Sequence, residues 1–331
     1  MSYSVGRIVL IVVTMFLIHS IPEALLSSDG LYIIVTYPYL YDDVKKVVCS
    51  DDIVINLIKP GVDPHEYHLT PTDADMIRRA SIVVSTAHTH FELKIKELIE
   101  KGEIGATLIE IPYLESMKIL KNPSTGMENY HEMLLHPENY VTFMNHLKRV
   151  LIKLRPQCSK IYEENVNQFI LRIQKIVNTS FKLNRMAVLD TPIIQYVAVW
   201  LGLNVSHILV SEEEIPIAPR DVEEVENVLR GYNDSIAVVT NGSKASQYLI
   251  ELANKYGRKV LVLPNPLLSS SIISTLEDVI RYANAFATNE KMYITSTPFL
   301  LQLDRYRVIL IALIVMTVAV SLLFRLRRWQ F

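Results

Sequence analysis

The residues best suited to chemistry in this sequence are histidines in or beside tight turns. His65 stands in the run Pro-Gly-Val-Asp-Pro-His-Glu-Tyr-His at 60–68, where one glycine and two prolines restrict the backbone and present the imidazole in a fixed direction. Neutral imidazole is a common ligand of transition metals such as zinc, copper, nickel and iron. A histidine in a loop is more often an ordinary surface residue, but a constrained turn after an apolar run favours a metal ligand at His65.

His88 and His90 form a second group, directly after the apolar run 82–85. If that run is a strand of a parallel sheet, both histidines follow its carboxyl end, where ligand clefts form in open α/β sheets. One of them could supply a metal ligand or an entry site, and His90 is our candidate. Two solvated loop histidines are the alternative.

Composition and motifs narrow the class of function. The net charge of −2 gives no reason to expect nucleic acid as a partner. The chain has 10 glycines but no phosphate-binding glycine loop, and it has neither a Gly-x-Ser-x-Gly elbow nor a His-Glu-x-x-His motif. No residue stands out as a general base beside the histidines. We therefore expect a binding protein and not an enzyme, with an exported metalloenzyme as the least favoured alternative.

Short β-branched runs alternate with longer helical patterns through most of the chain. Strands are predicted at 31–35, 53–58, 82–85, 107–111, 186–190, 205–210, 236–240 and 259–263. Helices are predicted at 71–80, 91–101, 221–230 and 245–256. Strands that are apolar throughout are typical of parallel sheets buried on both faces. The pattern predicts two copies of one α/β plan.

A stiff helical segment joins the two copies. Residues 156–183 carry an apolar stripe at helical spacing, preceded by a second helix at 138–154 that prolines bracket. A flexible linker would be rich in glycine and serine, and this segment is not. We expect an α/β fold with two similar lobes, at 28–137 and 185–300, each an open parallel sheet with helices on both faces, joined by a long rigid helix within 138–184.

Both ends of the chain carry apolar runs. Arg7 precedes a run at 8–18 whose length fits a secretory signal, predicted at 1–27. A longer run with arginines on both sides predicts a C-terminal transmembrane helix at 307–324, with a buried core helix as the alternative. The signal would place the main body outside the cell membrane and a tail, 325–331, inside.

The sequence has two cysteines, Cys49 and Cys158, without a CxxC pair or zinc-knuckle spacing. They could form one disulfide or remain buried thiols, and we favour the thiols.

The stretch 34–87 resembles the zinc- and manganese-specific substrate-binding proteins of ABC transporters. That family carries a Pro-Gly-x-Asp-Pro-His-x-Tyr turn and then a Thr-Pro-x-Asp helix start, which 60–67 and 70–73 reproduce. The resemblance implies that His65 is the first metal ligand. It also implies only small closing movements of the lobes around the metal.

The resemblance continues more weakly to about residue 295. The segment Tyr-His-Glu-Met-Leu-Leu-His-Pro at 130–137 matches the family's second-ligand segment with a spacing that differs by one residue. The resemblance makes His131 the second ligand, with Glu132 as the fallback. In the second lobe, strict spacing places Thr191 at the third ligand position, and Asp190 beside it is the stronger ligand. Helix capping is the equal alternative for Asp190.

The family's fourth ligand position falls on Asn265, where turn geometry is the favoured explanation for the asparagine. The predicted metal set is thus His65, His131, Asp190 and His90. The expected function is capture of Zn²⁺ or Mn²⁺ as transported cargo for an ABC permease. The alternatives are the same scaffold binding a non-metal small ligand, and a surface adhesion or interaction protein with a vestigial cleft.

Overall fold

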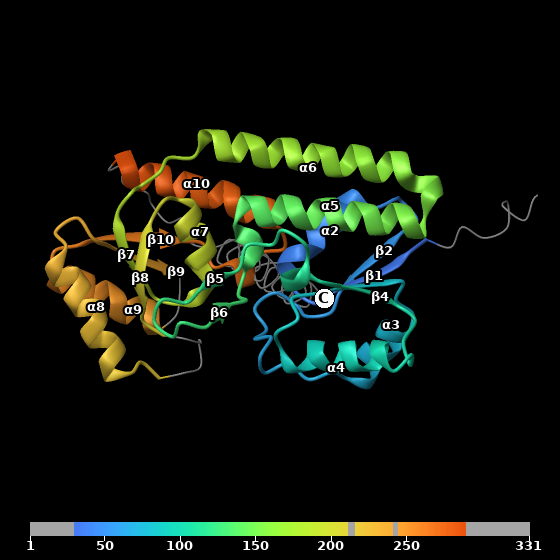
Figure 1. Ribbon diagram of the computed structural model, residues 1–331, viewed down its shortest axis with the longest axis horizontal. Coiled ribbons are helices and arrows are strands. Elements are labelled where there is room, and N and C mark those ends of the chain that lie inside the picture. The colour runs from blue at the N-terminus through green and yellow to red at the C-terminus, as the bar shows by residue number, and fades with distance from the viewer. Residues whose placement is uncertain (1–29, 211–215, 241–243, 289–331) are drawn as a thin grey trace, which may run out of the picture. The chain divides into compact units, whose positions relative to one another are not determined.

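Two parallel sheets with the same strand order form the framework of the protein (Figure 1). The computed structural model describes residues 30–210, 216–240 and 244–288. The first sheet has the order β2-β1-β3-β4 and consists of β1 (Tyr32–Val35), β2 (Ile53–Asn56), β3 (Ile82–Ser85) and β4 (Thr107–Glu110). The second has the order β10-β9-β7-β8 and consists of β7 (Met186–Leu189), β8 (Asn204–Ile208), β9 (Ile236–Thr240) and β10 (Lys259–Leu263). The predicted α/β chain with two similar lobes is confirmed.

Continuous apolar sequence explains the central strands. Every residue of β3 and of β9 is buried, as expected where helices cover both faces of a sheet. Within the first sheet, β1 and β3 pair without a register shift: Ile33 is opposite Ile82 and Ile34 is opposite Val83. The two strands therefore end side by side. The residues that follow these strands therefore meet at one edge of the sheet.

Helices cover both faces of each sheet (Figure 1). In the first lobe these are α2 (Tyr41–Val47), α3 (Pro71–Arg78) and α4 (His90–Glu100). In the second they are α7 (Gln195–Trp200), α8 (Pro219–Gly231), α9 (Lys244–Lys255) and α10 (Ile272–Thr288). Short 3-10 turns lie at η2 (Pro38–Leu40), η3 (Ile111–Tyr113), η4 (Met133–Leu135), η5 (Pro156–Cys158), η6 (Pro192–Ile194) and η7 (Pro266–Leu268). The short helix α2 and the long helix α10 were not predicted.

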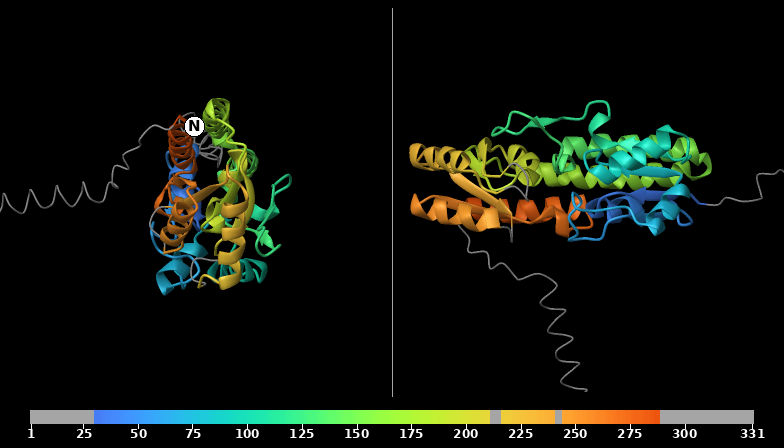
Figure 2. Two further views of the ribbon diagram at one scale, coloured as in Figure 1. Left: turned by 90° about the vertical axis from the view of Figure 1, so that its left-hand side faces the viewer. Right: turned by 90° about the horizontal axis from the view of Figure 1, so that it is seen from below.

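The connector consists of α5 (Pro137–Leu154) and α6 (Ser159–Thr179). Figures 1 and 2 show α6 running along both lobes with α10 beside it, and these two helices share an ion pair between Arg172 and Glu277. The buried face of α6 includes Tyr162, Val166 and Ile173, whereas Ile161 is 45% exposed. A single hydrophobic core includes residues of the first lobe, the connector and one face of the second sheet.

A small hairpin of the first lobe reaches the second lobe. It pairs β5 (Leu120–Lys121) with β6 (Glu128–Asn129) in antiparallel fashion. In its turn, Ser124 Oγ donates to the carbonyl of Ile208 at 2.8 Å. The hairpin was not predicted because its strands are short and polar.

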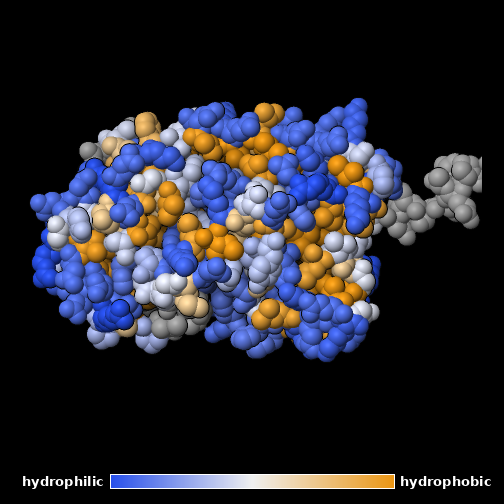
Figure 3. All heavy atoms as spheres, viewed as in Figure 1, coloured by the Kyte–Doolittle hydropathy of each residue, from blue (hydrophilic) through white to orange (hydrophobic). Residues whose placement is uncertain are grey.

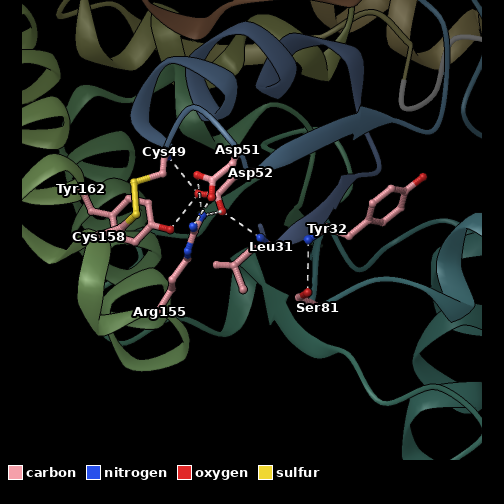
Figure 4. A network of polar contacts seen from close by, with 9 residues as sticks. All are labelled: Leu31, Tyr32, Cys49, Asp51, Asp52, Ser81, Arg155, Cys158 and Tyr162. Atoms are coloured by element: carbon pink, nitrogen blue, oxygen red, sulfur yellow. Dashed lines mark hydrogen bonds and ion pairs between the residues drawn. A yellow bond between two sulfur atoms is a disulfide. The ribbon is translucent and has the colours of Figure 1, made fainter. Parts of the chain in front are cut away.

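The cysteines form a disulfide, so the favoured assignment of buried thiols was wrong (Figure 4). Cys49 follows α2 and Cys158 precedes α6; they are 109 positions apart in sequence, with 6.4 Å between their Cα atoms. Proximity in the fold, which cysteine spacing does not reveal, decided the pairing. The bond ties the first sheet to the connector.

A polar network surrounds this disulfide (Figure 4). The buried guanidinium of Arg155 is paired with Asp51 and, at 2.6 Å, with Asp52. The same Asp52 carboxylate accepts hydrogen bonds from the Leu31 amide at 2.8 Å and from the Tyr162 hydroxyl at 2.7 Å. The start of β1 is therefore fixed to the start of α6 by charge-assisted hydrogen bonds.

The predicted signal sequence 1–27, transmembrane helix 307–324 and tail 325–331 lie outside the described residues. Within the described residues, no helix combines the length and the apolar composition needed to cross a bilayer. Figure 3 shows one face of the molecule, on which hydrophobic side chains gather in patches separated by hydrophilic ones.

Candidate metal centre

The turn that carries His65 is held by its own side chains. Asp63 Oδ1 accepts a hydrogen bond from the His65 amide at 2.8 Å, and Gly61 takes a φ of +81° that favours glycine. The Tyr67 hydroxyl donates to Asp73 Oδ2 at 2.7 Å, which ties the end of the turn to the first turn of α3. The Pro-Gly-x-Asp-Pro-His-x-Tyr run and the Thr-Pro-x-Asp helix start are thus one hydrogen-bonded unit that positions the imidazole.

The loop that carries His88 wraps around a buried carboxylate, that of Glu92 on α4. Glu92 accepts hydrogen bonds from the hydroxyls of Thr36 at 2.7 Å, Thr86 at 2.8 Å and Thr89 at 2.9 Å. It also accepts from the amides of Thr86 at 2.7 Å and of His88 at 3.2 Å. Because Thr36 follows β1 and Thr86 follows β3, one side chain organises the carboxyl edge of the sheet and the loop above it.

These contacts define the tautomer of His88. Burial raises the pKa of Glu92, but the hydrogen bonds from Thr36 and Thr86 act in the opposite direction. The net shift is downward, so the carboxyl is ionised at neutral pH. An ionised carboxylate only accepts, so the Thr86 hydroxyl proton goes to Glu92. The Thr86 oxygen, 3.0 Å from His88 Nδ1, therefore accepts Nδ1–H. Nε2 is left unprotonated, 3.3 Å from the Tyr37 hydroxyl.

His88 is also neutral in the metal-free protein. Burial and the neighbouring His131 together lower the pKa of His88 to about 4. The imidazole is therefore uncharged at neutral pH. Burial raises the pKa of Tyr37 well above its ordinary value, and that hydroxyl keeps its proton and donates to His88. A neutral imidazole with a fixed tautomer is the form that binds a metal ion.

His131 enters from a different segment, between β6 and η4. Its amide and its Nδ1 both lie 2.9 Å from Asn129 Oδ1. The next residue, Glu132, has a φ of +41°, and this left-handed turn reverses the chain before η4.

The three imidazoles converge. His65, His88 and His131 each offer a nitrogen, and these nitrogens lie within 4.8 Å of one another. The ring centroids are 5.4 Å apart for His65 and His88, 5.7 Å for His65 and His131, and 5.2 Å for His88 and His131. Three nitrogens this close to one another could hold one metal ion between them. The other group of potential ligands among the described residues contains Cys49 and Cys158, whose sulfurs are bonded to each other.

The histidines border a cavity of about 20 Å³, room for a water-sized species. Tyr37, Asp63, Pro64 and Glu132 complete the first-lobe side of the cavity. The second lobe contributes apolar side chains, and these are Pro192, Ile193 and Leu267. Imidazoles therefore face an apolar wall across the interface between the lobes.

The structure brings two of the four predicted ligands together, namely His65 and His131. His90 is exposed and lies outside the cavity, because Thr89 and Glu92 cap α4 so that His90 becomes its first residue. His88, two residues earlier, takes its place in the cluster. The Thr-His-Phe-Glu run at 89–92 is a capping-box signal that would have separated the two histidines.

Asp190 is fully buried and does not line the cavity. Its carboxylate accepts from the amide of Thr240 at 2.7 Å, the hydroxyl of Ser246 at 2.6 Å and the amide of Thr191 at 2.7 Å. Burial raises the pKa of Asp190, and these hydrogen bonds oppose the shift. Asn265 accepts from the amide of Leu267 at 2.9 Å and thus caps η7. Neither side chain is placed to coordinate an ion beside the histidines.

Comparison with known proteins gives this cavity a context. Residues 33–283 match the family model described as zinc-uptake complex component A, periplasmic (ZnuA). Over 162 residues the chain is 28% identical to the manganese ABC transporter substrate-binding lipoprotein PsaA of Streptococcus pneumoniae, which covers 45% of this chain and 50% of that protein. Over 144 residues it is 19% identical to the iron-binding protein YfeA of Yersinia pestis, covering 44% and 46% respectively. The chain therefore spans about half the length of these relatives.

Solved structures share the fold over most of this chain. FpvC from Pseudomonas aeruginosa, in complex with Mn²⁺, superposes with a TM-score of 0.64 at 21% identity, covering 78% of this chain and 97% of that one. The periplasmic zinc-binding protein TroA from Treponema pallidum gives 0.62 at 14% identity, covering 77% and 98%. At these identities the likeness shows the fold alone. The family model, which runs from β1 into α10, decides the assignment: the chain belongs to the ZnuA family of periplasmic zinc-uptake complex components.

Proposed function

We propose that the protein captures a divalent transition metal outside the cytoplasmic membrane and delivers it to an ABC import permease. The observation that carries the proposal is the convergence of three imidazole nitrogens within 4.8 Å, at the carboxyl edge of the first sheet and the interface between the lobes. Membership of the zinc-uptake family and the metals named for its relatives support it.

The donor set favours zinc over manganese as cargo. Zinc binds readily to nitrogen ligands in four-coordinate sites, whereas manganese prefers carboxylate, carbonyl and water oxygens. His65, His88 and His131 supply three nitrogens, and Glu132 or water is available for a fourth position. All three histidines belong to the first lobe, and Pro192, Ile193 and Leu267 of the second lobe cover them.

The test measures Zn²⁺ affinity of the full chain by competition with a chromogenic chelator. His65→Ala, His88→Ala and His131→Ala should each weaken binding by about 100-fold or more, because each removes a directly coordinating nitrogen. His90→Ala is the matched control, two residues from His88 but exposed, and should change the affinity by less than threefold. Unchanged affinity in His88→Ala would rule out the three-histidine site.

The apolar run 308–324, with its flanking arginines, supports a further part of the proposal. A membrane anchor there would hold the binding protein beside its permease, with the main body on the outer face. Removing residues 307–331 should move the protein from the membrane fraction to the soluble exported fraction. If the shortened chain stays in the membrane fraction, the anchor lies elsewhere.

A further inference from the structure

The hairpin residue Asn129 joins His131 to the second lobe. It is 2% exposed, and all the hydrogen-bonding capacity of its side chain is used. Its Oδ1 lies 2.9 Å from both the amide and Nδ1 of His131. Its Nδ2 donates to the Pro192 carbonyl at 2.9 Å and to Gln195 Oε1 at 2.8 Å. Both of these acceptors belong to the second lobe.

Backbone groups fix the orientation of this amide. The Pro192 carbonyl only accepts, so the NH₂ group of Asn129 must face it. The His131 amide only donates, so the Asn129 oxygen must face His131. An amide oxygen only accepts, and His131 Nδ1 must therefore carry the proton that it shares with Asn129. In the neutral ring, Nε2 is then the unprotonated nitrogen.

Gln195 contacts Asn129 on the side away from His131. Its Oε1 accepts from Asn129, and its Nε2 donates to the Lys121 carbonyl on the other strand of the hairpin at 2.8 Å. The Tyr196 hydroxyl donates to the Asn129 carbonyl at 2.6 Å and accepts from the Leu120 amide at 3.0 Å. Two consecutive residues of α7 thus clamp both strands of the hairpin that presents His131.

We propose that Asn129 is a positioning residue of the metal site, which holds His131 in the Nδ1–H tautomer, and that Gln195 makes this positioning depend on the second lobe. The inference rests on the proposed function in treating His131 as a metal ligand. It gives the second lobe a role in metal affinity although none of its described residues belongs to the histidine cluster. Through Pro192 and Gln195, the second lobe orients Asn129 and thereby the ring of His131. A hydrogen-bond acceptor on the distal nitrogen also raises the basicity of a ligating imidazole.

The first measurement reads the tautomer directly in the metal-free full chain. Long-range ¹H–¹⁵N NMR of histidine-labelled protein, with His131→Gln to assign the resonance, should show protonated Nδ1 and unprotonated Nε2 at His131. The same experiment on Asn129→Ala should show loss of this preference. Protonated Nε2 at His131 in the parent protein would overturn the proposal, whatever the metal affinities are.

The second measurement is Zn²⁺ affinity by chelator competition. Asn129→Ala should weaken binding by about 10- to 100-fold, the range for loss of an outer-sphere partner. Asn129→Asp keeps an acceptor for His131 and should restore most of the affinity, whereas a purely structural role would make it at least as harmful as Asn129→Ala. Gln195→Ala should weaken binding by about 3- to 10-fold.

The matched control is Asn122→Ala, in the same hairpin. Asn122 is also buried, at 5% exposure, but its side chain accepts from the Ser124 amide and makes no contact with His131 among the described hydrogen bonds. Asn122→Ala should bind Zn²⁺ within threefold of the parent. If Asn129→Ala binds as tightly as Asn122→Ala, the proposal is wrong. If Asn129→Ala does not fold, the proposal is tested by the tautomer of His131 in the parent protein and by the Zn²⁺ affinity of Gln195→Ala. A parent that binds no Zn²⁺ contradicts the proposed function, while its tautomer still tests the positioning role.

Discussion

The two lobes share one strand order, yet each closes the carboxyl edge of its sheet with a carboxylate from a different element. In the first lobe Glu92 comes from α4 and reaches back to the ends of β1 and β3. In the second lobe Asp190 comes from the end of β7 and reaches forward to Thr240, at the end of β9, and to Ser246 on α9. Both groups are buried and accept several hydrogen bonds.

This difference decides which lobe presents the histidine cluster. With Glu92 supplied from a helix, the loop after β3 lies over the carboxylate and turns His88 toward the cavity. In the second lobe, Asp190 lies at the end of its strand. Its carboxylate is directed into its own lobe, where Thr240 and Ser246 donate hydrogen bonds to it. The second lobe then presents Pro192 and Ile193 to the cavity. Among the described residues, the clustered imidazoles therefore all lie on the first-lobe side of the cavity, and the second lobe contributes an apolar wall.

The disulfide between Cys49 and Cys158 links the first lobe to the connector. Its removal should have the largest effect on the free energy of unfolding. Chain-entropy arguments for a loop of 109 residues give a loss of about 5 kcal/mol in the free energy of unfolding for Cys49→Ser/Cys158→Ser. Denaturant unfolding of the metal-free protein measures this loss. Zn²⁺ affinity of the folded variant should stay within threefold, since the histidines are held by other contacts. A parallel fall in affinity would show that the disulfide also shapes the site.

Substitution of the two buried carboxylates, Glu92 and Asp190, should affect stability in both lobes but metal binding in the first lobe only. Glu92→Ala and Asp190→Ala each leave several buried donors unpaired and should lower the free energy of unfolding by about 3–5 kcal/mol. Only Glu92→Ala should also weaken Zn²⁺ binding, by about 10-fold or more, because it releases the His88 loop. Asp190→Ala should remain within threefold when measured well below its melting temperature. Loss of affinity in Asp190→Ala would return Asp190 to the ligand set.

His88 should make the first lobe sensitive to acid. Its pKa is about 4 in the folded protein, below the value of 6.5 for the unfolded chain, so the unfolded chain binds the extra proton between these pH values. Stability of the metal-free protein should therefore fall as the pH drops from 6.5 to 4, by at most about 3 kcal/mol from this group. His88→Gln should remove that part of the slope in thermal unfolding across this range. An unchanged slope would show that His88 is not buried in its neutral form.

Substitution in the apolar wall of the cavity should have the smallest effect on Zn²⁺ affinity. Leu267 of the second lobe lines the cavity and offers no ligand, and its carbonyl accepts from the Gly61 amide at 3.3 Å in the turn that carries His65. Leu267→Ala keeps this backbone contact and should change Zn²⁺ affinity by less than about fivefold, or below about 1 kcal/mol. Stopped-flow transfer to a chelator should show somewhat faster release. A change above 10-fold would mean that the second lobe contributes more than cover.

Local sequence determined much of this molecule. The eight strands of the two large sheets follow from continuous apolar runs, and the predicted ranges differ from the observed ones by at most two residues at an end. The His65 turn follows from its glycine, prolines and Asp63, all of which act within a few residues. The hairpin was missed because its short, polar strands have no periodicity to detect. Hydrogen bonds with the second lobe hold it in place.

Only the tertiary structure decided which side chains share the cavity. His88 and His90 are equivalent by composition, and a helix cap that depends on Glu92 turns one inward and leaves the other exposed. Asp190 has the chemistry of a ligand, but donors from β9 and α9, some 50 residues away in the chain, occupy it. Residue type determines what a group can bind, whereas the groups packed around it determine whether that capacity is still available.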